Sequence, residues 1–201
     1  TLAPEIACAL ANRNCYLLCM STKYKFRNQS SQYFVSFATV YWIDLFIRNE
    51  YRTILLDSLV YCQKEKGLEI YAWCIMTSHV HLIIGTTNNK MEDILRDFKS
   101  HTSRLLRKEI AINSQESRKE WLLWMMERAG KKNGNNKGFQ LWQQNNHPIE
   151  LWDNYMKEQK LEYLHQNPVI SGFVYSAEDY IYSSARDYAG EKGLLEIKLL
   201  Q

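Results

Sequence analysis

The chain has 201 residues, of which 46% are hydrophobic, and its formal net charge is only +3. This length and composition are typical of one globular domain with a substantial core. The five cysteines form no Cys-x-x-Cys pair, which argues against a zinc ribbon or a disulfide-stapled scaffold and favours a reducing, cytoplasmic setting. No stretch is long and apolar enough to span a membrane, so we expect a soluble protein.

The first nineteen residues show neither the basic start nor the unbroken apolar run of a signal peptide. Because Met20-Ser21-Thr22 looks like a natural start, we expect residues 1–19 to be an extension without function and residues 20–201 to form a single domain. Basic residues gather in its central part, between Lys99 and Lys137. This cluster suits phosphate binding or an ordinary solvated helix face, and charge alone leaves both open.

The first predicted elements are two strands separated by a helix. Residues Tyr33 to Trp42 are rich in aromatic and β-branched side chains, which predicts a strand. Apolar residues recur at helical spacing from Tyr51 to about Lys66, and Gly67 is well placed to end this helix. Residues Glu69 to Met76 then predict the second strand.

A short Thr77-Ser78 step leads into a strand that begins with His79-Val80-His81 and ends at Gly85. Side chains two residues apart on a strand project from the same face, so both imidazoles point at one spot. A divalent metal would use both neutral ring nitrogens at once, although this pattern also arises by chance. The pair alone leaves a metal site and a structural role open.

Two helices and a polar loop follow. A long amphipathic helix is predicted from Met91 to about Ile110. Its predicted inward positions are Ile94, Leu95, Phe98, Leu105 and Leu106. Its predicted outward positions are Arg96, Lys99, Arg104, Arg107 and Lys108. A second helix is predicted from Ser117 to Arg128, and the glycines and polar residues of segment 130–138 predict a mobile basic loop within the domain.

The last strongly patterned segment is a helix that opens near residues 153–154 and should end just before Pro168. On this helix Tyr163 and Asn167 are four residues apart and share one face, with Lys160 one turn earlier on the same stripe. The predicted inward positions are Leu161 and Leu164. Taken alone, the stripe is also explained by a packed tyrosine, a capping asparagine and a solvated lysine.

The order strand, helix, strand, strand, helix, followed by further helices, predicts an α+β fold in which helices pack on one side of a sheet. Several motifs in the same order also make the chain resemble a known family. These motifs are Tyr71 to Ile83, Phe98 to Arg104, Leu141 to Trp152, Tyr163 to Val169 and Tyr180 to Ala185. Over nearly the whole span from Tyr33 to Gly190 the chain is similar to single-tyrosine HUH transposases, and among them to the IS200-like, REP-associated tyrosine transposases.

The resemblance implies an antiparallel, ferredoxin-like (RRM-like) sheet and a catalytic tyrosine on a late helix. Carried over by position, it makes Tyr163 the nucleophile, His79 and His81 metal ligands, and Asn167 the third ligand. Family members use glutamine or another polar residue at that last position, so Asn167 departs from the commonest pattern. The implied cofactor is a divalent metal, Mg²⁺ or Mn²⁺, and the implied partner is single-stranded or hairpin DNA.

Four side chains are predicted to contact that DNA. Lys99 and Arg104 would hold the backbone, Trp142 would stack on an exposed base, and Lys160 would hold the phosphate or favour the phenolate of Tyr163. A tyrosine hydroxyl, with a reference pKa near ~10, is a poor nucleophile at neutral pH and needs such help. The product implied by the resemblance is a 5′-phosphotyrosine link and a free 3′-hydroxyl, with no nucleotide cofactor.

The main hypothesis is therefore a metal-dependent DNA endonuclease and strand transferase. One alternative is a domesticated DNA-binding protein that recognises repeat hairpins without cleaving them. Another is a metal phosphoesterase that uses activated water. The sequence leaves monomer and homodimer open, and the apolar tail from Glu191 to Gln201 would pack either on the domain or on a partner subunit.

Overall fold

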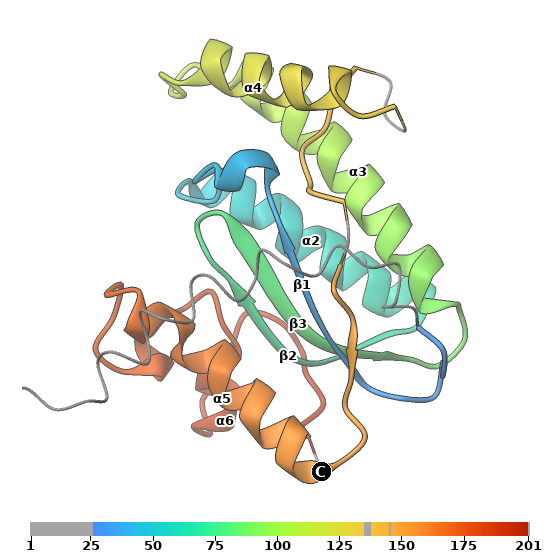
Figure 1. Cartoon of the computed structure of the whole chain (residues 1–201). Helices are drawn as coiled ribbons and strands as arrows, with labels where there is room; N and C mark the ends of the chain where they lie inside the picture. The colour runs from blue at the N-terminus through green and yellow to red at the C-terminus, as the bar shows by residue number, and fades with distance from the viewer. Residues whose placement is uncertain (1–25, 135–137, 145, 201) are drawn as a thin grey trace, which may run out of the picture.

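The structure is a computed structural model, and it describes residues 26–134, 138–144 and 146–200 (Figure 1). The strands are β1 (Tyr33–Ala38), β2 (Leu68–Ile75), β3 (His79–Thr86) and β4 (Ile149–Glu150). The helices are η2 (Val40–Trp42), α2 (Asn49–Lys66), α3 (Met91–Ile112), α4 (Lys119–Lys131), α5 (Asn154–Ile170), η3 (Ala177–Asp179) and α6 (Ala185–Tyr188). The expected extension, residues 1–19, and residues 135–137 of the expected basic loop lie outside the described residues.

The strands form one antiparallel four-stranded sheet in the order β2-β3-β1-β4. In chain order, and apart from α4, the elements read β1-α2-β2-β3-α3-β4, which is the ferredoxin-like arrangement. β3 lies between β2 and β1, and Ala38 of β1 pairs with His79 while Ser36 pairs with His81. The predicted fold class is confirmed, and the histidine pair lies at the start of an inner strand as expected.

Helices cover both faces of the sheet, so the expectation of helices on one side is wrong. Val35 and Leu82 belong to the larger core, which includes residues of α2 and α3. Phe34 and Ile83, their neighbours along the same strands, belong to a second core with Leu164 of α5. Neighbouring strand residues face opposite ways, so α5 lies across the sheet from α2, as Figure 1 also shows.

Several predicted boundaries shift. β1 ends at Ala38 rather than at Trp42, because the chain turns into η2. α2 ends at Lys66 as predicted, and Gly67 adopts the left-handed conformation with φ 67°. α5 runs past Pro168 to Ile170, because a proline in the last turn removes only one helical hydrogen bond. α4 likewise continues beyond Arg128.

Two predicted orientations on α3 are also wrong. Leu105, expected to face inward, is 37% exposed, and Lys99, expected to face outward, folds its ammonium group against the protein. The remaining predicted inward residues of α3 are buried. A helix stripe assigned by periodicity is least certain at its margins, and both residues lie there.

The C-terminal tail and the segment at Ser184 before it pack on the domain beside the edge strand β2. The backbone N–H of Ser184 donates to the carbonyl of Trp73, and that of Lys198 donates to the carbonyl of Ile70, each at 2.9 Å. Leu195 is buried in the larger core. This cover occupies hydrogen-bonding groups that an open edge would offer to another chain. Among the described residues, no helix is long and apolar enough to cross a membrane.

Candidate active site and basic groove

The histidine pair lies on the face of the sheet that α5 covers. The ring centroids of His79 and His81 are 4.8 Å apart and their planes meet at 75°. Burial is the main cause that lowers the pKa of His79 to about 4 and the pKa of His81 well below its usual value. Both rings are therefore neutral near pH 7, which is the form that binds a metal.

Hydrogen bonds orient the two rings. Nδ1 of His79 lies 3.2 Å from Oγ of Ser78, and Nε2 of His81 lies 3.2 Å from Nδ2 of Asn167. An amide N–H donating to Nε2 of His81 leaves the ring proton on Nδ1, an atom that is buried without a hydrogen-bond partner among the described residues. The lone pair of Nε2 thus faces the Asn167 amide, which also contacts His79.

The donor set fits a divalent metal. Two neutral imidazoles and one amide converge, and rotation of the Asn167 side chain would present its oxygen in place of its nitrogen. Within the described part of the chain, no group of three histidine, cysteine, aspartate or glutamate side chains could hold a metal. A metal at the histidine pair would therefore depend on the asparagine as its third protein ligand.

Tyr163 reaches the same place from α5. This helix is capped by Asp153, whose Oδ1 accepts a hydrogen bond of 2.6 Å from the backbone N–H of Met156, and buried Leu164 anchors it to the sheet. The Tyr163 ring lies 5.3 Å from the His81 ring and 6.0 Å from the Phe34 ring, between centroids, and is 38% exposed. The phenol is thus beside the histidine pair and open to a substrate.

Lys160 places a positively charged ammonium group beside Tyr163. Its ammonium nitrogen lies 5.3 Å from the centroid of the Phe34 ring and 5.8 Å from that of Tyr163. Burial lowers the pKa of Lys160, and its charge contributes to the lowered pKa of His81. The structure therefore brings together the four residues that the sequence predicted for the catalytic and metal site, namely His79, His81, Tyr163 and Asn167, and the predicted DNA contact Lys160 lies beside them.

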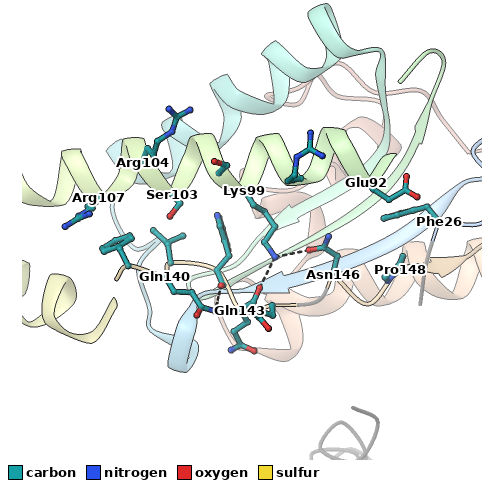
Figure 2. Close-up of a pocket in the computed structure, with 16 residues that line it drawn as sticks. Phe26, Glu92, Lys99, Ser103, Arg104, Arg107, Gln140, Gln143, Asn146 and Pro148 are labelled. Atoms are coloured by element: carbon teal, nitrogen blue, oxygen red, sulfur yellow. Dashed lines mark hydrogen bonds between the residues drawn. The ribbon is translucent and has the colours of Figure 1, made fainter. Parts of the chain in front are cut away.

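Two of the predicted DNA contacts lie elsewhere and are engaged within the protein. Trp142 is only 5% exposed, its indole N–H donates to Oγ1 of Thr102 at 3.0 Å, and its ring stacks on Phe46. A ring packed in this way cannot stack on a base, so that prediction is wrong. The Lys99 ammonium donates to the carbonyl of Gln143 at 2.8 Å and to Oδ1 of Asn146 at 2.9 Å (Figure 2).

A basic groove of about 930 Å³ runs between α3 and segment 139–148 (Figure 2). Its lining residues Leu141 and Trp142 belong to the larger core, on the face of the sheet away from Tyr163. Three arginines line the groove. Arg96 pairs with carboxylates of its own helix, and Arg107 lies 3.5 Å from a carboxylate oxygen of Glu127. Arg104 is exposed and makes no salt bridge within the described residues. The sequence indicated Lys99 and Arg104 on α3 and Trp142 on the facing segment, but the other lining residues were not predicted.

Three residues at the active site were missed by the sequence analysis. Phe34 stacks on His81 with centroids 5.5 Å apart, Ser78 holds His79, and Trp42 lies edge-on to His79 at 5.4 Å. The alternation of β1 places Phe34 and the histidines on the same face once the strand register is known. That register is a long-range property, so no local signal could have revealed this contact.

The fold and site define a ferredoxin-like protein whose sheet carries a histidine pair opposite a tyrosine on a covering helix. The chain belongs to the family of IS200-like transposases, because the model of that family matches residues 29–159. The family resemblance found in the sequence is thereby confirmed, and the protein is a transposase by family. No curated protein matches the chain.

Two solved structures are similar to this chain. A REP-associated tyrosine transposase bound to a REP hairpin matches 90% of this chain and 94% of its own, with a TM-score of 0.61 and 16% sequence identity. This similarity supports the fold. A putative transposase from Deinococcus radiodurans matches 73% of this chain and 97% of its own, with 20% identity and a TM-score of 0.41, which is too low to carry an argument.

Proposed function

We propose that this transposase is a metal-dependent endonuclease and strand transferase that cuts single-stranded DNA beside a hairpin through a 5′-phosphotyrosine intermediate. The convergence of Tyr163, the two histidines and the Asn167 amide at one place supports this proposal most directly. His79 and His81 are close in the sequence, as are Tyr163 and Asn167, but the two pairs are far apart in the chain. Their meeting requires the whole fold, as a functional site does.

In the proposed reaction the phenolic oxygen of Tyr163 attacks the scissile phosphorus while the bond to the 3′-oxygen breaks. The phenol loses its proton to solvent, and the departing 3′-oxygen gains one. Lys160 lies beside the phenol, where its positive charge favours the phenolate and attracts the phosphate. Because the phosphodiester energy is kept in the phosphotyrosine, attack by a second 3′-hydroxyl rejoins strands without a nucleotide cofactor.

His79, His81 and Asn167 would hold the divalent metal. When bound, such an ion would polarise the scissile phosphate and stabilise the charge that develops there. Two nitrogen ligands suit Mn²⁺ better than Mg²⁺, while availability in cells favours Mg²⁺. With Nδ1–H of His79 donating to Oγ of Ser78, the lone pair of Nε2 would be left for a ligand role.

We propose that the hairpin binds in the basic groove. The solved structure with a TM-score of 0.61 is that of a relative bound to a REP hairpin. Arg104 is the cation we expect to contact phosphate, because the Lys99 ammonium already donates to Gln143 and Asn146. In this proposal Lys99 supports the groove wall rather than the DNA.

The test is to incubate the protein with single-stranded hairpin DNA and Mg²⁺ or Mn²⁺ and to look for a covalent protein–DNA adduct. Wild type should form the adduct and Tyr163→Phe should not. Tyr155→Phe is the matched control, since Tyr155 lies on the same helix and is 73% exposed. His81→Ala should abolish the adduct while leaving hairpin binding in place.

The alternatives predict other results. Hairpin binding that needs no metal and yields no adduct with wild type would identify a DNA-binding protein that does not cleave. Cleavage that survives Tyr163→Phe would identify a phosphoesterase that uses water. An adduct that persists in Tyr163→Phe would assign the nucleophile elsewhere.

A further inference from the structure

An exposed tryptophan lies at the edge of the histidine pair. Trp42 is 58% exposed, and its ring meets the His79 ring edge-on with centroids 5.4 Å apart. It belongs to η2, the turn that follows β1, and because Ala38 pairs with His79, this turn lies beside the start of β3. A large apolar ring that is open to solvent beside a catalytic site is available for a substrate.

The backbone of this turn is strained and firmly held. Tyr41 and Trp42 have φ values of 57° and 55°, a conformation that aromatic residues rarely adopt. Buried Thr39 secures the turn, since its hydroxyl donates to the carbonyl of Ile43 at 2.8 Å and approaches that of Ser78 at 3.1 Å. The N–H of Val40 donates to a carbonyl of segment 139–148 at 2.8 Å. The fold therefore holds the backbone of Trp42 in place beside the histidine pair.

Trp42 and Tyr163 flank the histidine pair. The ring contacts run from Trp42 to His79 at 5.4 Å, from His79 to His81 at 4.8 Å, and from His81 to Tyr163 at 5.3 Å. In an in-line displacement at phosphorus, the leaving oxygen departs opposite the attacking oxygen. With Tyr163 attacking from one end of this row, the nucleotide that leaves with the 3′-hydroxyl is directed toward the other end.

We propose that Trp42 is a stacking platform for the base immediately 5′ to the cleaved phosphate, and that it retains the released 3′-hydroxyl strand for rejoining. The inference rests on the proposed function and adds a substrate subsite to it. Every base has a flat face, so stacking holds this nucleotide without reading its identity. Trp42 touches the substrate but not the reacting atoms, so it is a positioning residue.

The binding experiment uses Tyr163→Phe protein, which should bind DNA without cleaving it, and hairpin oligonucleotides with a normal or an abasic nucleotide 5′ to the cut. Loss of the base should weaken binding about tenfold, within the range of one base–aromatic stack. Adding Trp42→Ala should weaken binding of the normal oligonucleotide by the same factor and abolish the difference between the two. Trp42→Phe, which keeps an aromatic ring, should restore most of the difference in affinity between the normal and the abasic oligonucleotide.

Two further variants separate stacking from folding. Trp42→Gly relieves the positive φ, so it should fold at least as well as wild type and still lose the base dependence. Trp121→Ala removes a tryptophan that is 46% exposed on α4, and it should retain the base dependence. If the abasic nucleotide weakened binding by the same factor in protein with Trp42 and in Trp42→Ala protein, the proposal would be overturned.

The catalytic readout uses protein with Tyr163 intact. Trp42→Ala should lower the ratio of rejoined to cleaved DNA more than it lowers cleavage. Normal adduct formation with no coupling between Trp42 and the base would overturn the platform and leave the proposed function standing. Coupling in the binding assay without any adduct from wild type would support the platform and overturn the proposed chemistry.

Discussion

Glu116→Gln should destabilise the protein by about 3 kcal/mol at neutral pH and remove part of its acid sensitivity. The Glu116 side chain is fully buried, and its carboxylate accepts hydrogen bonds from Nε of Arg48 at 2.9 Å and Nε of Arg118 at 3.0 Å. Arg118 also donates to the carbonyl of Asp44, whose side chain accepts from Thr77 just before the histidine strand. The cluster of Glu116, Arg48 and Arg118 thus stabilises the loop at Asp44, which lies beside the start of the histidine strand.

The magnitude follows from the pKa of this carboxyl. Burial by itself would raise the pKa of Glu116, but the hydrogen bonds from Arg118 and Arg48 outweigh burial and lower it from 4.5 to about 2. At about 1.4 kcal/mol for each pH unit, this difference corresponds to roughly 3 kcal/mol. Because the folded pKa is the lower one, the contribution is complete above pH 4.5 and disappears as the pH falls toward 2.

Urea unfolding of wild type and Glu116→Gln at pH 7, 5, 4 and 3 measures this difference. The free energies of unfolding should differ most at pH 7, and the difference should have fallen by roughly half at pH 3. Glu178→Gln, which changes an exposed carboxylate on η3, serves as the matched control and should follow wild type throughout. A difference between wild type and Glu116→Gln that stays constant from pH 7 to pH 3 would refute the reasoning.

Three further predictions concern residues outside the catalytic site. Trp142→Ala should lower the free energy of unfolding by about 3–5 kcal/mol while the folded fraction keeps its hairpin affinity; weaker binding at unchanged stability would contradict the core assignment. Burial lowers the pKa of Lys99 to about 8, so the stability of wild type relative to Lys99→Met should rise with pH between 8 and 10.5; a difference in urea midpoint that stays constant over this range would contradict it. Gly67→Ala should destabilise by about 1–2 kcal/mol, since φ is 67° and the new Cβ would lie 2.6 Å from Oγ1 of Thr87; an unchanged melting temperature would count against it.

The parts of the site that the sequence predicted follow from local periodicity. Alternation along a strand places His79 and His81 on one face, and helical spacing aligns Tyr163 with Asn167. Both relations are set within a few residues. That the two faces meet was implied only by the family resemblance, because it depends on α5 crossing the sheet.

The errors come from long-range packing. Val40 and Trp42 have strand-like side chains, yet hydrogen bonds of this segment to Leu141 and Ser78 bend it into a turn. Trp142 was predicted to stack on an exposed base, but it packs with Thr102 and Phe46, which are distant in the chain. Strands that are apolar on both faces also concealed the second helical layer.

The placement of Tyr163 and Asn167 on one helix has a consequence for accidental cleavage. Four residues along an α-helix span about 6 Å, so the nucleophile and the amide move as one rigid unit. If α5 lifts from the sheet, the phenol leaves the histidine pair at the same moment as the candidate third ligand. The site would then be assembled completely or not at all, and a loosened protein would be unable to nick DNA that it encounters by chance.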